Sequence, residues 1–157
     1  MIKRIEHLYK LYNNLFEYFP IIYSFYKEYS GKEKDILLSY LILPLTLNED
    51  SRTKLLNTNV RSSLFTFCKE SNHLIGLPDR VKQYEQITND CIQYGIDNEV
   101  FQISEDLQIT VNNQFDMKNS HLINVNTNKS KAAEKLSYIL KSYDIPTVYR
   151  HLGVVEL

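Results

Sequence analysis

The sequence has no tryptophan, and it has only four glycines, four prolines and two cysteines among its 157 residues. Because glycine and proline are the strongest breakers of regular structure, their scarcity argues against a β fold with many turns and favours long helices. Cys68 and Cys91 lie far apart and form no CxxC pair, so no metal or redox motif is indicated. We expect both cysteines to be small buried hydrophobic residues.

Long apolar segments are also missing. The longest runs from Leu37 to Leu47 and is interrupted by Ser39, Pro44 and Thr46. It is well short of the roughly 20 residues that a membrane-spanning helix needs. The first ten residues, MIKRIEHLYK, lack the apolar region of a secretory signal. We therefore expect a cytoplasmic protein that makes no membrane contact.

Motifs for catalysis or cofactor binding do not occur in the sequence. Gly31-Lys32 lacks the preceding glycine and the following Ser or Thr of a phosphate-binding loop, and neither GxGxxG nor GxSxG is present. We expect no enzyme activity and no catalytic, metal or cofactor site, although catalytic groups also converge from distant positions, which leaves a small hydrolase as an alternative. None of the histidines has the three- or four-residue spacing of a helical metal pair: His7, His73, His121 and His151.

The composition is that of an ordinary folded domain. Hydrophobic residues make up 43% of the chain and charged residues 24%, with a net charge of −1, which argues against disorder. The length predicts one domain over residues 1–157. We divide it into an aromatic-rich helical part (1–72), a winged-helix-like segment (73–112), and a connection with a C-terminal helix (113–157). The expected fold class is mainly α (α+β), with one small β-hairpin.

Aromatic residues are abundant, with 12 Tyr and 7 Phe. Apolar side chains recur at steps of three and four from Leu8 to Tyr29, which predicts a helix that Pro20 kinks or restarts. Its apolar stripe wraps much of the girth, which fits a central core helix or a helix that docks on a partner protein. The residues that we expect at a partner interface are Tyr12, Phe16, Phe19, Tyr23 and Tyr26.

Capping signals divide the next part of the chain. Ser30 and Glu33 have capping-box spacing for a helix that Pro44 bends or ends. Asn48 has N-cap character for a short following helix. Another helix is expected over residues 60–69. Its buried side should comprise Leu64, Phe65, Phe67 and Cys68.

A clear amphipathic helix follows from Leu77 to Tyr94, with Gly95 expected just beyond its end. Alternating residues between Val100 and Val111, around the turn-prone residues 104–106, predict a β-hairpin. A helix followed by such a hairpin is the order of a winged helix. The Asn-rich residues 112–128 read as a connection, with one short strand at 122–125. A last helix carries apolar residues from 132 to 143 before Pro146 ends the segment, and the apolar tail 148–157 should be packed down.

The charge pattern bears on the main alternative, a free-standing winged-helix regulator that binds DNA. No Lys or Arg lies between Lys82 and Lys118. Since DNA affinity comes largely from basic residues on phosphates, this face should repel a duplex. The acidic residues of the interval are Glu85, Asp90, Asp97, Glu99, Glu105, Asp106 and Asp116. Basic residues of the last helix can contact a DNA backbone or simply form a solvated face: Lys129, Lys131 and Lys135.

The order of several short motifs resembles the middle component of three-component ABC systems and the related small accessory subunit of Lamassu-type bacterial defence systems. The resemblance spans nearly the whole chain. Its motifs are Tyr12-Asn13-Asn14, Leu43-Pro44-Leu45, Arg52 with Leu55, Arg61-Ser62-Ser63-Leu64, Tyr94-Gly95, and Leu152-Gly153-Val154. Phe67 stands where the family pattern has a Trp, and the Asn-rich stretch after Val111 also departs from it.

The resemblance implies a non-enzymatic subunit that acts against phage or plasmids. Its partners would be an ABC or SMC-like ATPase with a coiled coil, and an effector, often a nuclease. It would brace the ATPase and help restrain the effector, and it would meet DNA only through the complex. Arg52 and Arg61 of the shared motifs complete the expected partner interface.

Overall fold

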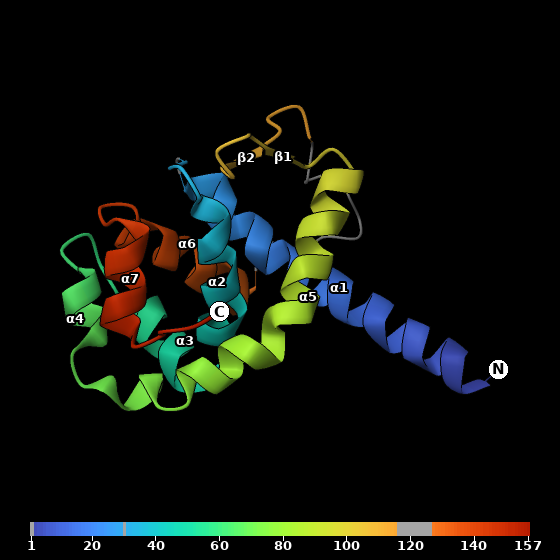
Figure 1. Ribbon diagram of the computed structural model, residues 1–157. Coiled ribbons are helices and arrows are strands. Elements are labelled where there is room, and N and C mark those ends of the chain that lie inside the picture. The colour runs from blue at the N-terminus through green and yellow to red at the C-terminus, as the bar shows by residue number, and fades with distance from the viewer. Residues whose placement is uncertain (1, 30, 116–126) are drawn as a thin grey trace.

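The computed structural model describes residues 2–29, 31–115 and 127–157, without the side chains of residues 9–13. This part of the chain is mainly helical with one two-stranded antiparallel hairpin, which confirms the expected fold class (Figure 1). No helix in it is both long and apolar enough to span a membrane. The α-helices are α1 (Ile2–Glu28), α2 (Ser39–Thr46), α3 (Glu49–Leu56), α4 (Leu64–Cys68), α5 (Leu77–Asp97), α6 (Asn128–Leu140) and α7 (Ile145–Leu152); the 3-10 turns are η1 (Asp35–Leu38) and η2 (Ser71–Leu74), and the strands are β1 (Phe101–Ile103) and β2 (Ile109–Val111).

The core forms around the C-terminal half of α1, which packs against α6, α5 and α2. Residues 19–26 of α1 and 41–46 of α2 are buried throughout, as expected for helices that are apolar on several sides. The N-terminal half of α1 projects away from this body, and residues 2–8 are all exposed (Figure 1). One helix therefore has a buried half and a solvated half.

Neither internal proline breaks its helix. Pro20 lies within the continuous α1 and Pro44 within α2, so no new helix starts at Pro20 and α2 does not end at Pro44. The alternatives, a kink at Pro20 and a bend at Pro44, stay predictions. Each helix instead carries a hydroxyl that bonds back to a carbonyl four residues earlier. Ser24 donates to the Pro20 carbonyl and Thr46 to the Ile42 carbonyl, both at 2.7 Å. Burial on several sides holds both helices in place despite the lost N–H groups.

The segment before α2 is held by the hairpin. The N–H groups of Lys34 and Ile36 donate to the carbonyls of Asp106 (2.7 Å) and Leu107 (3.2 Å). The helical segment starts only at Asp35, as the 3-10 turn η1. The start that was predicted from Ser30 and Glu33 is therefore wrong, although Ser30 itself lies outside the described residues.

Side-chain caps set the starts of α3 and α4. The Asn48 side chain accepts the Ser51 N–H at 3.0 Å, which confirms the predicted cap. Ser63 accepts the Thr66 N–H at 3.1 Å, so α4 begins at Leu64 and not at residue 60. The short helix buries Leu64 and Phe67 but leaves Phe65 69% exposed. The prediction of a buried Phe65 is wrong.

Gly95 lies inside α5 rather than beyond its end. A Cβ atom at this position would come within 2.2 Å of the Phe101 ring, so glycine lets the β1 ring pack directly on the helix. The helix continues to Asp97 and Asn98 is its C-cap. The predicted hairpin is confirmed, with Phe101, Gln102 and Ile103 opposite Val111, Thr110 and Ile109.

The C-terminal part contains one more helix than predicted. Pro146 lies in the first turn of α7, where its missing N–H has no helical partner to lose. Pro146 therefore opens a helix instead of ending the segment. Val148, Leu152 and Val154 are buried, which confirms the packed tail as far as residue 154; Val155 and Leu157 are 93% and 54% exposed, so the prediction is wrong for the last three residues. The strand expected at residues 122–125 lies outside the described residues.

Candidate functional site

The aromatic residues predicted at a partner interface lie at different depths. Phe19, Tyr23 and Tyr26 are buried within the chain itself, at 1%, 5% and 2% exposure. Phe16 is half-buried. Tyr12 belongs to α1, and its side chain lies outside the described part of the structure. Three of the five rings are thus enclosed by the fold, and the docking role of the set stays a prediction.

These rings connect α1 to α5 and to the hairpin. The Phe19 ring lies 4.9 Å from Tyr94 at 74° and 5.4 Å from Phe101, between ring centroids. Phe16 packs edge-on against Tyr94 at 5.9 Å, and Tyr26 against Phe101 at the same distance. Such edge-to-face pairs add roughly 0.5–1.5 kcal/mol to the burial of the rings. Within this chain, the cluster fixes the hairpin on the helices.

The projecting half of α1 carries an apolar face that sequence reasoning missed. Ile2, Ile5 and Leu8 are 75%, 59% and 65% exposed and stand at steps of three on one side of the helix. We expected the helix to begin only at Leu8, so this face was not considered. The spacing of Ile2 and Ile5 ahead of Leu8 was the available signal. Large exposed apolar residues that gather on one face mark interaction sites.

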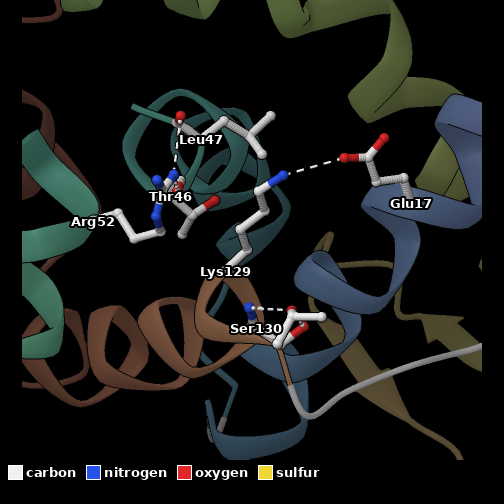
Figure 2. A network of polar contacts seen from close by, with 7 residues as sticks. Glu17, Thr46, Leu47, Arg52, Lys129 and Ser130 are labelled. Carbon is white, nitrogen blue, oxygen red and sulfur yellow. Dashed lines mark hydrogen bonds and ion pairs between the residues drawn. The ribbon is translucent and has the colours of Figure 1, made fainter. Parts of the chain in front are cut away.

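Arg52 is engaged inside the chain. Its guanidinium donates to the carbonyls of Thr46 (3.1 Å) and Leu47 (3.2 Å), at the end of α2 (Figure 2). A cation at the C-terminal end of a helix bonds carbonyls that have no helical partner and complements the helix dipole. Arg61 is exposed in the loop before α4, and its backbone N–H donates to the Asn59 side chain at 2.9 Å. Contact of either arginine with a partner stays a prediction.

The three lysines predicted to contact a DNA backbone all belong to α6. Lys129 pairs with Glu17 of α1 at 3.2 Å (Figure 2). Lys135 donates to the Thr58 carbonyl at 3.1 Å, whereas Lys131 is exposed. Two of the three ammonium groups thus bond to the chain itself. Their contact with DNA stays a prediction.

Acidic residues occupy the solvent side of α5 and the hairpin turn. Glu105 and Asp106 are exposed at the turn. On α5, Asp90 and Asp97 accept hydrogen bonds from glutamine side chains four residues earlier, at 2.9 and 2.8 Å. A basic residue is missing from the described part of this face, residues 83–115. Its charge opposes contact with a phosphate backbone.

The cysteines and histidines of the described residues form no metal cluster: no group of three His, Cys, Asp or Glu residues is placed to hold an ion. Burial raises the pKa of the Cys68 thiol to about 11 and that of Cys91 to about 12, so both thiols are protonated near neutral pH. The His73 ring packs against Phe67 at 4.7 Å, and burial lowers its pKa.

Comparison with known proteins gives one family. Residues 2–156 match the family described as ABC-three component system Middle Component 3. No curated protein and no solved structure matches the chain. The winged-helix character of residues 73–112 stays a prediction. Because the match covers nearly every residue, the chain belongs to the Middle Component 3 family of ABC-three component systems.

Proposed function

We propose that the chain is a non-catalytic accessory subunit that braces an ABC ATPase and restrains an effector in a bacterial defence complex. Membership in a three-component ABC system implies partners that contain an ABC ATPase. In this proposal the ATPase is SMC-like with a coiled coil, the effector is a nuclease, and the complex is of the Lamassu type. ATP hydrolysis and DNA cleavage then belong to the partners.

The apolar face of the projecting half of α1 carries the proposal. Ile2, Ile5 and Leu8 face solvent on a helix that extends beyond the body of the protein (Figure 1). An amphipathic helix of this kind buries its apolar side in a groove or against other helices. A coiled-coil partner offers such a helical surface. We therefore assign docking to residues 2–8, while the buried rings of α1 hold the folded body to which this half is attached.

The acidic hairpin supports the proposal that the partners, and not this chain, contact DNA. Its exposed turn residues Glu105 and Asp106 disfavour direct binding of a duplex. DNA contact in the proposed complex is therefore indirect and runs through the ATPase and the effector.

Co-expression with the ATPase subunit and affinity pull-down test the docking helix. A variant with both Ile5→Asp and Leu8→Asp should lose most of the captured ATPase, because two carboxylates would be buried in the interface. Ile75→Asp is the matched control, since Ile75 is 73% exposed on a different part of the chain. Equal capture by all three proteins would overturn the docking assignment.

The alternative is a free-standing winged-helix DNA-binding regulator. The observation that favours it is the order of α5 and the β1–β2 hairpin. Such a regulator must bind duplex DNA by itself, most tightly at low salt. A gel shift with the isolated chain at about 50 mM salt distinguishes the two functions: salt-sensitive binding supports the regulator, and free DNA at high protein concentration supports the accessory subunit.

A further inference from the structure

A pocket of about 530 Å³ opens between the loop that follows α3 and the C-terminal end of α6. One wall comes from residues 58–60, 62 and 63, and the other from residues 135, 138, 139 and 141–143. The Lys135 ammonium donates to the Thr58 carbonyl at 3.1 Å and so holds the two walls together. The volume lies within the roughly 300–1,000 Å³ that is typical of small-molecule sites.

The pocket is positively charged. Lys135 and Lys141 line it, and none of its lining residues is Asp or Glu. A third ammonium lies at its edge, because Lys32 donates to the carbonyl of the lining residue Tyr143 at 2.9 Å. Two carboxylates approach this region. Glu28 accepts the Tyr138 hydroxyl at 3.0 Å, and Glu134 interacts electrostatically with Tyr138 and Lys135. The three ammonium groups still outnumber them. The balance of these charges favours an anion.

The lining also contains groups that recognise a phosphate and the organic part of a ligand. Ser62, Ser63 and Ser142 line the pocket. The Ser62 and Ser63 oxygens accept the N–H groups of Asn59 and Thr66, and such a hydroxyl can still donate its own proton to a phosphate oxygen beside lysine ammonium groups. Tyr138 lines the pocket and is 48% exposed, and the Lys141 ammonium lies 5.1 Å from the centroid of its ring. A half-exposed aromatic ring can stack with a planar group such as a nucleobase.

We propose that this pocket binds a small phosphorylated ligand of nucleotide size. The lysines and serines hold the phosphates, and Tyr138 packs against the organic part. A duplex does not fit the observations as well, because the site is concave and faces only one short loop and one helix end. The inference does not depend on the proposed docking function, since the pocket lies near the C-terminal end of α1 and the docking face at the other end.

Isothermal titration of the full-length chain with ATP, ADP and inorganic pyrophosphate tests the proposal. We expect saturable binding of a nucleotide, with weaker binding of pyrophosphate because it lacks the planar group. Lys141→Glu should weaken nucleotide binding by at least about tenfold, as expected for the loss of a hydrogen bond to a charged group. Lys131→Glu is the matched control, because Lys131 is exposed on α6, the helix that Lys141 caps, and does not line the pocket.

A second variant guards against loss of folding as the explanation. Val60 lines the pocket and its side chain is fully exposed, so Val60→Glu adds a carboxylate with little effect on the fold. It should weaken nucleotide binding while the circular dichroism spectrum stays unchanged. The proposal would be overturned if none of the three ligands gave a heat of binding at concentrations up to about 1 mM. Binding that Lys141→Glu and Val60→Glu leave intact, or binding of oligonucleotides alone, would overturn it too.

Discussion

Gly95 is a position where one missing methyl group decides how the hairpin packs on α5. At an exposed position inside a helix, replacing Gly by Ala raises the free energy of unfolding by up to about 1 kcal/mol. At Gly95 the new methyl would meet the buried Phe101 ring at 2.2 Å. Gly95→Ala should therefore lower the free energy of unfolding by about 1–3 kcal/mol, measured by urea denaturation.

A double mutant provides the control for this overpacking. Phe101→Leu removes the ring that the new methyl would strike. In that background Gly95→Ala should cost clearly less than it does in the natural chain, because the two changes are coupled through one contact. Additive losses would show that the cost arises elsewhere.

Asp35 makes stability depend on pH. Its carboxylate is buried and accepts the N–H groups of Ile109 (2.7 Å) and Lys32 (3.2 Å). Desolvation outweighs these bonds and raises its pKa from 3.8 to about 6. The folded chain therefore holds the proton more tightly than the unfolded chain. The raised pKa of Asp35 therefore adds to the free energy of unfolding at pH below about 4. This added stability is lost as the pH rises through about 6.

Urea denaturation at several pH values checks this sign. Between pH 4 and pH 6, the natural chain should lose free energy of unfolding relative to Asp35→Asn. The amide keeps an oxygen that can accept the Ile109 N–H, but it does not ionise. Parallel pH profiles of the two proteins would contradict a raised pKa at this carboxyl.

At the scale of elements, the predictions from sequence were correct where a short sequence pattern is compatible with only one local structure. The Asn48 cap, the amphipathic face of α5 and the 101–111 hairpin all follow from short patterns that neighbouring parts of the chain do not override. The prolines and Gly95 are different. Pro146 can end a helix or begin one, and Gly95 can stop a helix or admit a ring. Tertiary packing chooses between these meanings, so the sequence pattern alone does not.

The candidate site shows the same limit. The aromatic stripe of α1 correctly indicated a helix apolar on several sides, but whether the chain or a partner covers it depends on where α5 and the hairpin lie. Arg52 reads as a surface cation in the sequence, and only the end of α2 reveals its carbonyl partners. The pocket walls are separated by more than 70 residues, which no local pattern connects.

The cap of α3 gives a test at this scale. Asn48→Ala removes the acceptor of the Ser51 N–H and should lower the free energy of unfolding by about 1 kcal/mol, within the range of roughly 0.5–2 kcal/mol for such caps. Asn48→Asp should restore most of the loss, because a carboxylate also caps and complements the helix dipole. Equal losses in both variants would assign the effect to other contacts of Asn48.

At the scale of the whole molecule, α1 divides into two halves with different expected stability. Residues 2–8 are exposed, whereas residues 19–26 are buried. In the isolated chain, amide hydrogens of the first half should exchange by local fraying and those of the second half only on extensive unfolding. Binding of the ATPase subunit should slow exchange in residues 2–8 by at least about tenfold. Unchanged exchange there in a formed complex would place the interface elsewhere.

The packing of α1 on α6 also has a consequence for how the chain is made. Helix α1 is covered by α6, which follows it by about a hundred residues: Lys129 pairs with Glu17, and the Tyr138 hydroxyl donates to Glu28. During synthesis, the aromatic half of α1 leaves the ribosome long before the residues that cover it. Contacts so distant in sequence slow folding, and uncovered apolar surface favours aggregation meanwhile. A nascent chain that stops before α6 should therefore aggregate unless chaperones or its partner subunits bind it early.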